Sequence, residues 1–250
     1  MEEKKSPLLR TVDKVKPPYP LNKFPKDFGF KLGREIVYLL TTKGKPSLEG
    51  PEWEEIFALC IGAEWKPSNV GLDDVVMETC AWGAKTVKSS NPVNAKKIRL
   101  ISGRNSPVFS FGEKDPLSLN TEELGSQIIS IWNERVYGVR KAFKHLRTVV
   151  LVKSTNLDVV AVFEFETITY DSDKYNWIWN TNKNLEAHDK ANGEHRFTWQ
   201  PHGSQFTMIE DIPPGRLIVQ IKPPPKLDKE SILKGIGFKK DWITVFQKND

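Results

Sequence analysis

Apolar residues recur every three or four positions between Glu52 and Ala63, which is the spacing of a helix that buries one face. The apolar set consists of Trp53, Ile56, Phe57, Cys60 and Ile61. Pro51 precedes this segment and Gly62 stands near its end, as is usual at the two ends of a helix. The pattern therefore predicts a helix over residues 52–63.

A second helical pattern follows Asn120. This asparagine is a suitable N-cap, and Glu123 occupies the reciprocal position of a capping box. The apolar stripe after it consists of Leu124, Ile128, Ile131, Trp132, Val136 and Val139. We predict a long helix from Thr121 to about Leu146. Residues 33–42 predict a further short helix or a buried segment.

Runs rich in β-branched and aromatic residues predict strands elsewhere. The clearest are residues 148–153 and 158–166, with a turn between them. The other predicted strands are residues 74–79, 81–87, 97–102, two strands within 195–212, and 217–222. Residues 168–185 are rich in aromatic residues and asparagine, and we expect them to be irregular. The order of elements predicts an α/β or α+β fold, a mixed sheet core flanked by helices with a β-rich C-terminal part.

The length of 250 residues suits one large domain, and no low-complexity linker divides the chain. We expect a single domain over residues 1–250, with a Lys- and Pro-rich arm (1–28), a core (50–166) and a β-rich part (167–250). No apolar run approaches the ~18–20 residues that span a bilayer. The N-terminus has acids where a signal peptide has cations. We therefore expect a cytoplasmic protein without membrane contact.

Cysteine and histidine usage predicts no zinc site. Cys60 and Cys80 belong to no CxxC motif or Cys/His cluster, and we expect both to be small buried hydrophobes. The histidines show no metal-ligand spacing along the chain; they are His145, His188, His195 and His202.

The net charge is +5 and the isoelectric point is near 9.0, which is compatible with a polyanionic partner. Basic residues gather in two segments. The first contains Lys85, Lys88, Lys96, Lys97, Arg99 and Arg104, and the second contains Arg135, Arg140, Lys141, Lys144, His145 and Arg147. Either segment alone could be a solvated face.

The segment from Asn69 to Lys88 carries the candidate chemistry. Asp73 and Asp74 open one predicted strand, and Lys85 lies on the next. In a hairpin, an acid at the start of one strand can meet a lysine on the other. A carboxylate can hold Mg²⁺ at a scissile phosphate while a lysine positions the attacking water. The pair therefore predicts metal-assisted cleavage of a phosphodiester and favours a phosphate-facing role for the basic segments.

These residues resemble the PD-(D/E)xK nuclease superfamily, and within it the type II restriction endonucleases. The core of that family has a helix with a Glu, a strand that begins with the metal-binding Asp, and a strand with Glu-x-Lys, often within Trp-Glu-x-Lys-Thr. Residues 82–86 here read WGAKT. The resemblance assigns the family lysine to Lys85 and the metal-binding acid to Asp73 or Asp74, of which we prefer Asp74.

Two acids of this resemblance have more than one candidate. The helix acid corresponds to Glu54 or Glu55, and we prefer Glu55. Gly83 stands where the family has its second strand acid, and glycine cannot ligate a metal. The nearest replacement in sequence is Glu78. The alternatives from elsewhere in the chain are Glu55, Glu164 and Glu166.

Two polar turns are candidates for DNA contacts. Arg104 and Asn105 follow a predicted strand, and such side chains bind phosphate, guanine or adenine. His202 and Gln205 stand at a glycine-containing turn and could read base edges in a groove. Lys88 and Arg99 complete the predicted DNA-binding set and would contact the phosphate backbone. Each turn could equally be held by its own hydrogen bonds.

The resemblance implies a type II site-specific deoxyribonuclease, a restriction-endonuclease-like fold, Mg²⁺ as cofactor and double-stranded DNA as substrate. Residues 50–166 would be catalytic and residues 167–250 would recognise DNA. A palindromic site would match a homodimer, and a cognate methyltransferase is implied by the resemblance. The alternatives are a DNA-binding protein that has lost its metal site, and a protein-interaction domain that uses Trp177, Trp179 and Trp199.

Overall fold

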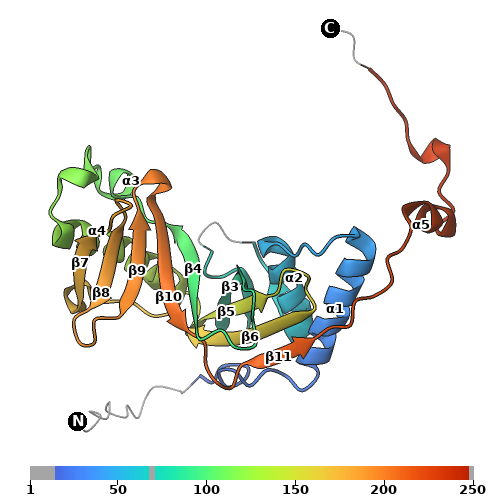
Figure 1. Ribbon diagram of the computed structural model, residues 1–250, viewed down its shortest axis with the longest axis horizontal. Coiled ribbons are helices and arrows are strands. Elements are labelled where there is room, and N and C mark those ends of the chain that lie inside the picture. Colours follow the sequence, from blue (N-terminus) through green and yellow to red (C-terminus); the bar gives the residue numbers. More distant parts are fainter. Residues whose placement is uncertain (1–14, 68–70, 248–250) are drawn as a thin grey trace.

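The computed structural model describes residues 15–67 and 71–247 and contains two β-sheets that lie side by side along the long axis (Figure 1). Sheet A has the strand order β1 (Glu64–Trp65), β2 (Val75–Met77), β3 (Cys80–Lys88), β5 (His145–Lys153), β6 (Val159–Glu166) and β11 (Leu217–Gln220). Sheet B has the order β4 (Lys97–Arg104), β10 (Gln205–Asp211), β9 (His195–Gln200), β8 (Leu185–Asp189) and β7 (Tyr175–Trp179). Strands β3 and β5 are parallel, and the other neighbouring pairs are antiparallel.

Helices α1 (Phe28–Lys43) and α2 (Gly50–Ile61) cover one face of sheet A. Phe57 of α2 packs edge-on against Trp82 of β3, with the ring centroids 5.9 Å apart. The start of α2 is stabilised by a capping box between Glu49 and Glu52. This packing fixes α2 against the β2–β3 hairpin, where the candidate chemistry lies.

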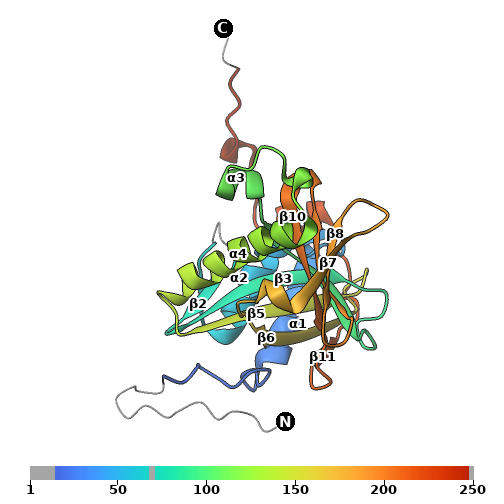
Figure 2. The ribbon, with the colours of Figure 1, turned by 90° about the vertical axis from the view of Figure 1, so that its left-hand side faces the viewer.

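Helix α4 (Thr121–Arg140) packs against both sheets. Its Ile128 and Trp132 share one buried cluster with Leu146 of sheet A and with Phe197 and Phe206 of sheet B. Figure 2 shows this helix running across the strands of sheet A, on the face opposite α1 and α2. Each sheet therefore buries an apolar face against α4, and the helix joins the two sheets into one body.

The remaining helical elements are short. They are α3 (Pro107–Phe111), α5 (Lys229–Gly235) and the 3₁₀ turns Pro116–Ser118, Ser172–Lys174, His202–Ser204 and Lys240–Trp242. The described chain is mixed α+β with two sheets and five α-helices, which confirms the predicted class. None of the helices in residues 15–67 and 71–247 is both long and apolar enough to cross a membrane.

The predicted helices are present, but the C-terminal end predicted for the long helix is wrong. Helix α2 matches the predicted segment to within two residues at each end, and residues 33–42 lie within α1. The long helix was predicted to reach about Leu146, but it ends at Arg140, just after the last residue of its apolar stripe. Leu146 instead lies on β5, where it pairs with Ala81 of β3 and is fully buried.

Most predicted strands are present, and residues 168–185 are more regular than expected. They contain β7, and β8 begins at Leu185. Tyr175 and Trp177 face the core while Asn176 and Ile178 are exposed, so the strand alternation exists. Large apolar residues on both faces of β7 obscure this period in the sequence. Cys60 and Cys80 are buried free thiols, as predicted.

After β11 the chain leaves the body of the protein, and α5 lies apart from both sheets (Figure 1). The segment retains exposed apolar side chains, among them Phe246, which is 85% exposed. The other large ones are Leu227, Ile236, Phe238, Trp242, Ile243 and Val245. An apolar segment of this size on a protein surface is typical of an interaction site.

Candidate catalytic site

Asp74 and Lys85 meet where β2 and β3 begin their pairing. Asp74 immediately precedes β2, and its neighbour Val75 pairs with Trp82 of β3. The Lys85 Nζ lies 3.7 Å from the Asp74 Oδ2. The antiparallel register therefore brings the predicted acid and the predicted lysine together.

Asp74 is almost fully buried, with 3% of its surface exposed. Burial raises the pKa of its carboxyl, and the charges of Glu54 and Asp73 raise it further. The ammonium of Lys85 and a hydrogen bond from the Ala84 N–H, at 3.2 Å to Oδ2, act in the opposite direction. The net pKa lies above the usual range because the desolvation of the carboxylate is the largest effect.

Lys85 is held in place by a second contact. Its Nζ donates a hydrogen bond of 3.0 Å to the carbonyl oxygen of Gly71. Gly71 has φ +67°, a left-handed conformation that glycine adopts without strain. The lysine side chain is about one quarter exposed, so its ammonium lies between the buried acid and the surface.

Further acids lie close to Asp74. Asp73 has a buried Oδ1 that accepts no hydrogen bond from the residues described. Glu54 of α2 is near enough to raise the pKa of Asp74, and its Oε2 accepts a hydrogen bond of 3.2 Å from the Trp65 indole. The site therefore gathers carboxylates from α2 and from the segment before β2.

Glu55, the preferred candidate for the helix acid, does not lie at this site. Glu55 is exposed and lines a separate groove between α1 and α2, together with Glu35 and Glu52. One residue along a helix rotates a side chain by about 100°. Glu54, the other candidate, is therefore the residue that faces Asp74.

The backbone of Gly71 and Leu72 passes directly over Gly83. A Cβ on Gly83 would lie 2.9 Å from the Gly71 carbonyl oxygen and 3.2 Å from the Leu72 Cα. Real Cβ atoms do not approach backbone so closely, so an acid at this position does not fit this arrangement. The absence of an acid at this position thus has a local steric reason.

The proposed replacements for that acid lie elsewhere. Glu78 is exposed at the tip of the β2–β3 hairpin, in a left-handed conformation with φ +51°. Glu164 is buried on the side of Trp82, whose indole Nε1 donates to its Oε1 at 2.7 Å. Adjacent residues of a strand point to opposite faces, so Gly83 and Lys85 face away from Trp82. Glu164 therefore lies on the face of sheet A opposite Lys85, and Glu78 lies at the tip of the hairpin.

Glu164, which is buried, and Glu166, which is exposed, both contact Arg147 in a different network. Glu164 accepts a hydrogen bond of 2.8 Å from the Tyr19 hydroxyl and pairs with Arg147 at 3.4 Å. The Nε of Arg147 lies 3.5 Å from Glu166. Asn22 donates through its backbone and side chain to Glu164 and accepts the Glu164 N–H at 2.6 Å. This network attaches the N-terminal segment to sheet A.

Arg135 is a site residue that was not singled out as such by the sequence. Its Nη1 donates a hydrogen bond of 2.6 Å to the Ser102 carbonyl oxygen, and its guanidinium lies 5.5 Å from the Trp132 ring. Burial lowers the pKa of Arg135, while the charge of Asp74 raises it. The advance signals were its place in the second basic segment and in residues 131–135 of the predicted long helix, which has a looser likeness to the same family.

The predicted DNA-binding residues fall into two groups. Gln205 pairs with Arg104 across β10 and β4, and the exposed His202 lies in the adjacent turn, so these three share one end of sheet B. Lys88 is exposed at the end of β3, and Arg99 is exposed on the outer face of sheet B, where it donates to Thr198 Oγ1. The structure therefore does not gather Lys88 and Arg99 with the other three.

Asn105 is fully buried, which contradicts its predicted contact with DNA. Its Nδ2 donates a hydrogen bond of 2.9 Å to the Ile128 carbonyl, and its own carbonyl accepts one from the Trp199 indole. Its backbone N–H donates to Ser204. Asn105 therefore joins α4, β9 and the β9–β10 turn.

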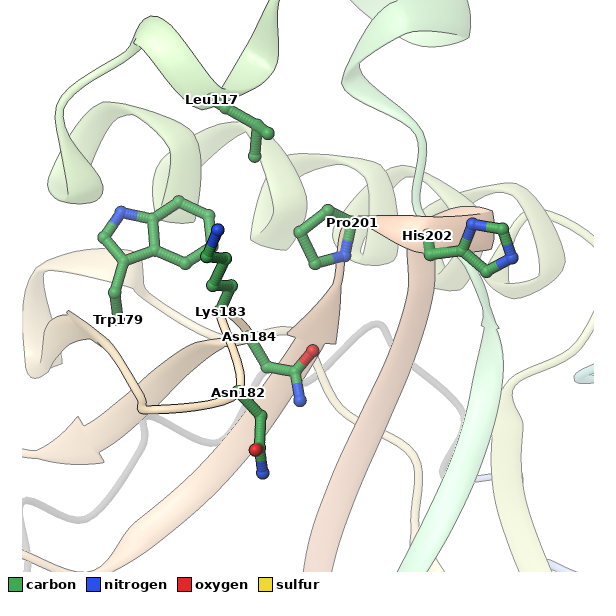
Figure 3. Close-up of a pocket in the computed structure, with 7 residues that line it drawn as sticks. All are labelled: Leu117, Trp179, Asn182, Lys183, Asn184, Pro201 and His202. Carbon is green, nitrogen blue, oxygen red and sulfur yellow. The ribbon is translucent and has the colours of Figure 1, made fainter.

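A pocket of about 430 Å³ opens beside that turn. Figure 3 shows Pro201 and His202 on one side and Trp179 on the other, with Leu117 above them. Polar side chains from the β7–β8 turn complete the lining, namely Asn182, Lys183 and Asn184. Aromatic, amide, imidazole and ammonium groups together suit a nucleic-acid surface.

Comparisons of the chain with protein-family models, with curated proteins and with solved structures gave no match.

Proposed function

We propose that this protein is a type II restriction endonuclease of the PD-(D/E)xK superfamily, which hydrolyses phosphodiester bonds in double-stranded DNA with Mg²⁺. The observation that carries the proposal is the contact of the buried Asp74 with Lys85 on adjacent strands. The neighbouring carboxylates of Asp73 and Glu54 are suitable metal ligands for phosphoryl chemistry, and the guanidinium of Arg135 supplies positive charge.

The acids at this position fit a magnesium ion. Asp73 has a buried carboxylate oxygen with no donor among the residues described, which is costly unless a cation or water satisfies it. All candidate ligands are carboxylate oxygens, the donor type that Mg²⁺ prefers. Asp74 and Asp73 would hold the ion, and Glu54 would support it from α2. A bound Mg²⁺ supplies charge neutralisation at the phosphate.

The other steps belong to side chains of the chain itself. Lys85, held by Asp74 and the Gly71 carbonyl, would place its ammonium at the scissile phosphate and orient the attacking water. Arg135, held by Ser102, would contribute positive charge toward the same phosphate. Asp74 must be ionised to act, because a protonated carboxyl is a poor metal ligand.

DNA recognition is proposed for the end of sheet B that carries Arg104, Gln205 and His202. An arginine can contact phosphate or guanine, and a glutamine can pair with adenine. The exposed Lys88 and Arg99 would contribute sequence-independent attraction to the duplex. We also propose a methyltransferase of matching specificity as the functional partner.

A homodimer is the proposed assembly, and the exposed C-terminal segment supports it. Its apolar residues are accompanied by charged residues of both signs, among them Lys239, Lys240 and Asp241. The groove between α1 and α2 exposes Tyr38 and Leu59 beside Glu55 and other acids. The exposed apolar side chains of the segment and of the groove suit docking of the segment onto a second copy.

A non-catalytic DNA-binding protein is the second candidate. It is favoured by Gly83, because the backbone crossing leaves no room for a second strand acid. The hypothesis that the Trp-rich region forms a protein-interaction surface has less support. Trp177 and Trp199 are buried in the core, and only Trp179 among the three is substantially exposed, at 37%.

The two candidates are separated by incubating the purified protein with unmethylated phage and plasmid DNA, with Mg²⁺ or with EDTA. We expect discrete fragments with Mg²⁺ and intact DNA with EDTA. Duplex binding without any nicking in either condition, on DNA of several sources, would favour the non-catalytic candidate and contradict the nuclease proposal.

A further inference from the structure

Three side chains with metal-binding atoms meet on sheet B, away from Asp74 and Lys85. Glu186 and His188 lie on β8 and His195 on β9, and one ligand atom from each lies within 4.8 Å of the other two. Leu185 and Ala187 of β8 face the core beside α4, so Glu186 and His188 lie on the outer face of the sheet. All three are partly buried.

The sequence conceals this group. Glu186 and His188 have the i, i+2 spacing of a strand face, which is common by chance. His195 joins them because the β8–β9 pairing shifts between Ala187 and His188, so that His188 pairs directly with His195. Without that bulge, His195 would be out of register with His188. The expectation of no metal-ligand spacing among the histidines holds along the chain but not in space.

The distance between the first two ligands suits a tetrahedral ion. The His188 Nε2 lies 3.4 Å from the Glu186 Oε2. Two ligands of a tetrahedral zinc ion with bonds of ~2.1 Å are about 3.4 Å apart. The rings of His188 and His195 are stacked with their centroids 4.9 Å apart, so the imidazole of His195 also lies beside this pair of ligands.

Neighbouring groups are compatible with the tautomers that a metal requires. The His188 Nδ1 lies 3.3 Å from the Gly193 carbonyl, to which it can donate, so that its Nε2, which faces Glu186, can bind an ion. The His195 Nε2 lies 2.8 Å from the Phe197 carbonyl and 2.9 Å from the Thr198 hydroxyl, so a proton on Nε2 leaves the lone pair on Nδ1. Such outer hydrogen bonds orient the ligands of metal sites.

We propose that Glu186, His188 and His195 form a binding site for a divalent transition cation of the Zn²⁺ class, separate from the proposed magnesium site. Imidazole donors favour Zn²⁺ over Mg²⁺. Three protein ligands leave a fourth position for water or an external ligand. The ion would join β8 to β9 and, through the Glu186–Asn180 hydrogen bond, hold the 180–184 turn that lines the pocket in Figure 3.

The test is titration of the metal-free full chain with ZnCl₂ by calorimetry, in buffer with millimolar Mg²⁺. We expect one Zn²⁺ per chain with a dissociation constant of micromolar or below, and a rise in the melting temperature on binding. His188→Ala and Glu186→Gln should each weaken binding at least about 10-fold to 100-fold. His202→Ala removes a histidine elsewhere on sheet B and should bind as the wild type does.

Circular dichroism and melting curves without metal establish that each variant is folded. His188→Ala is the primary variant because the contacts of His188 are confined to the sheet surface. Absence of saturable binding, equal loss in His202→Ala, or unchanged affinity in His188→Ala would overturn the proposal. Asp74→Asn should retain Zn²⁺ binding, whereas its loss there would place the ion at the candidate catalytic site and also overturn it.

Discussion

At the residue scale, the burial of Asp74 is the central feature of the candidate site. Its charge is costly in the folded protein, because desolvation outweighs the help of Lys85 and the Ala84 N–H. The ionised carboxylate therefore lowers the free energy of unfolding. Such a cost is common at functional sites, where a side chain is kept for its chemistry.

Asp74→Asn should raise the melting temperature of the metal-free protein at neutral pH and reduce DNA cleavage at least about 10²-fold. The folded-state pKa of Asp74 is raised, so ionisation destabilises the fold. The wild type should be less stable than the variant above that pKa; the difference should shrink as the pH falls below it and vanish only near the ordinary pKa of an unfolded aspartate, about 3.9. Melting curves from pH 4 to 8 check this, and a variant less stable throughout would contradict it.

Gly83→Glu would restore the strand acid of the family pattern, but we expect loss of stability and no gain in cleavage. The new Cβ would meet the Gly71 and Leu72 backbone, at a cost of about 1–3 kcal/mol or more. Urea unfolding measures this. The control is Gly138→Glu on α4, where a Cβ has no neighbour within 4 Å. A Gly83→Glu protein as stable as the wild type would refute the backbone crossing.

At the element scale, α4 organises the molecule because it packs against both sheets. Gly125 is the point of closest approach to sheet B, since a Cβ there would lie 2.2 Å from the Trp177 ring. Trp177 is buried, so its ring has little space to move. The position of β7 on α4 thus depends on the absence of a side chain at one residue.

Two alanine substitutions in α4 should therefore have opposite effects. Gly125→Ala should destabilise the protein by about 2–3 kcal/mol or more, because the ring of Trp177 must move. Gly138→Ala on the exposed face should stabilise it by about 0.5–1 kcal/mol, because alanine is the better helix former. Urea unfolding of both variants gives the comparison, and equal effects would contradict the packing described.

The elements show which features a sequence can reveal. The apolar stripe of α4 follows the helical period and β6 is a continuous apolar run, so both elements were predictable. The contact of Asp74 with Lys85 followed from hairpin geometry. The choice of Glu54 over Glu55 required the rotation of α2 relative to β2, and the burial of Asn105 required the docking of α4. These depend on tertiary packing, which local patterns do not encode.

At the scale of the whole molecule, the C-terminal segment is the feature that the body does not explain. Its large apolar residues, such as Trp242 and Phe246, are exposed, and α5 lies apart from both sheets in Figure 1. Leaving such side chains in water forgoes ~1.5–3 kcal/mol for each. Docking on a second copy would recover part of this free energy.

Removal of the residues after Pro225 should therefore convert a dimer into a monomer. Light scattering coupled to size-exclusion chromatography gives the mass directly. Trp242→Asp in the full chain should weaken the dimer in the same direction, while Lys229→Ala should leave it intact. A monomeric wild type, or a truncated chain that remains dimeric, would contradict docking of this segment.

The central claim is that Asp74 and Lys85 cleave DNA with Mg²⁺. The most direct measurement is the single-turnover cleavage rate of the wild type, Asp74→Asn and Lys85→Ala on the same unmethylated DNA, with duplex binding measured in parallel. We predict Mg²⁺-dependent cleavage by the wild type, at least about 10²-fold slower cleavage by each variant, and similar DNA binding by all three. Wild-type cleavage rates in Lys85→Ala, or no cleavage by any of the three proteins, would contradict the account.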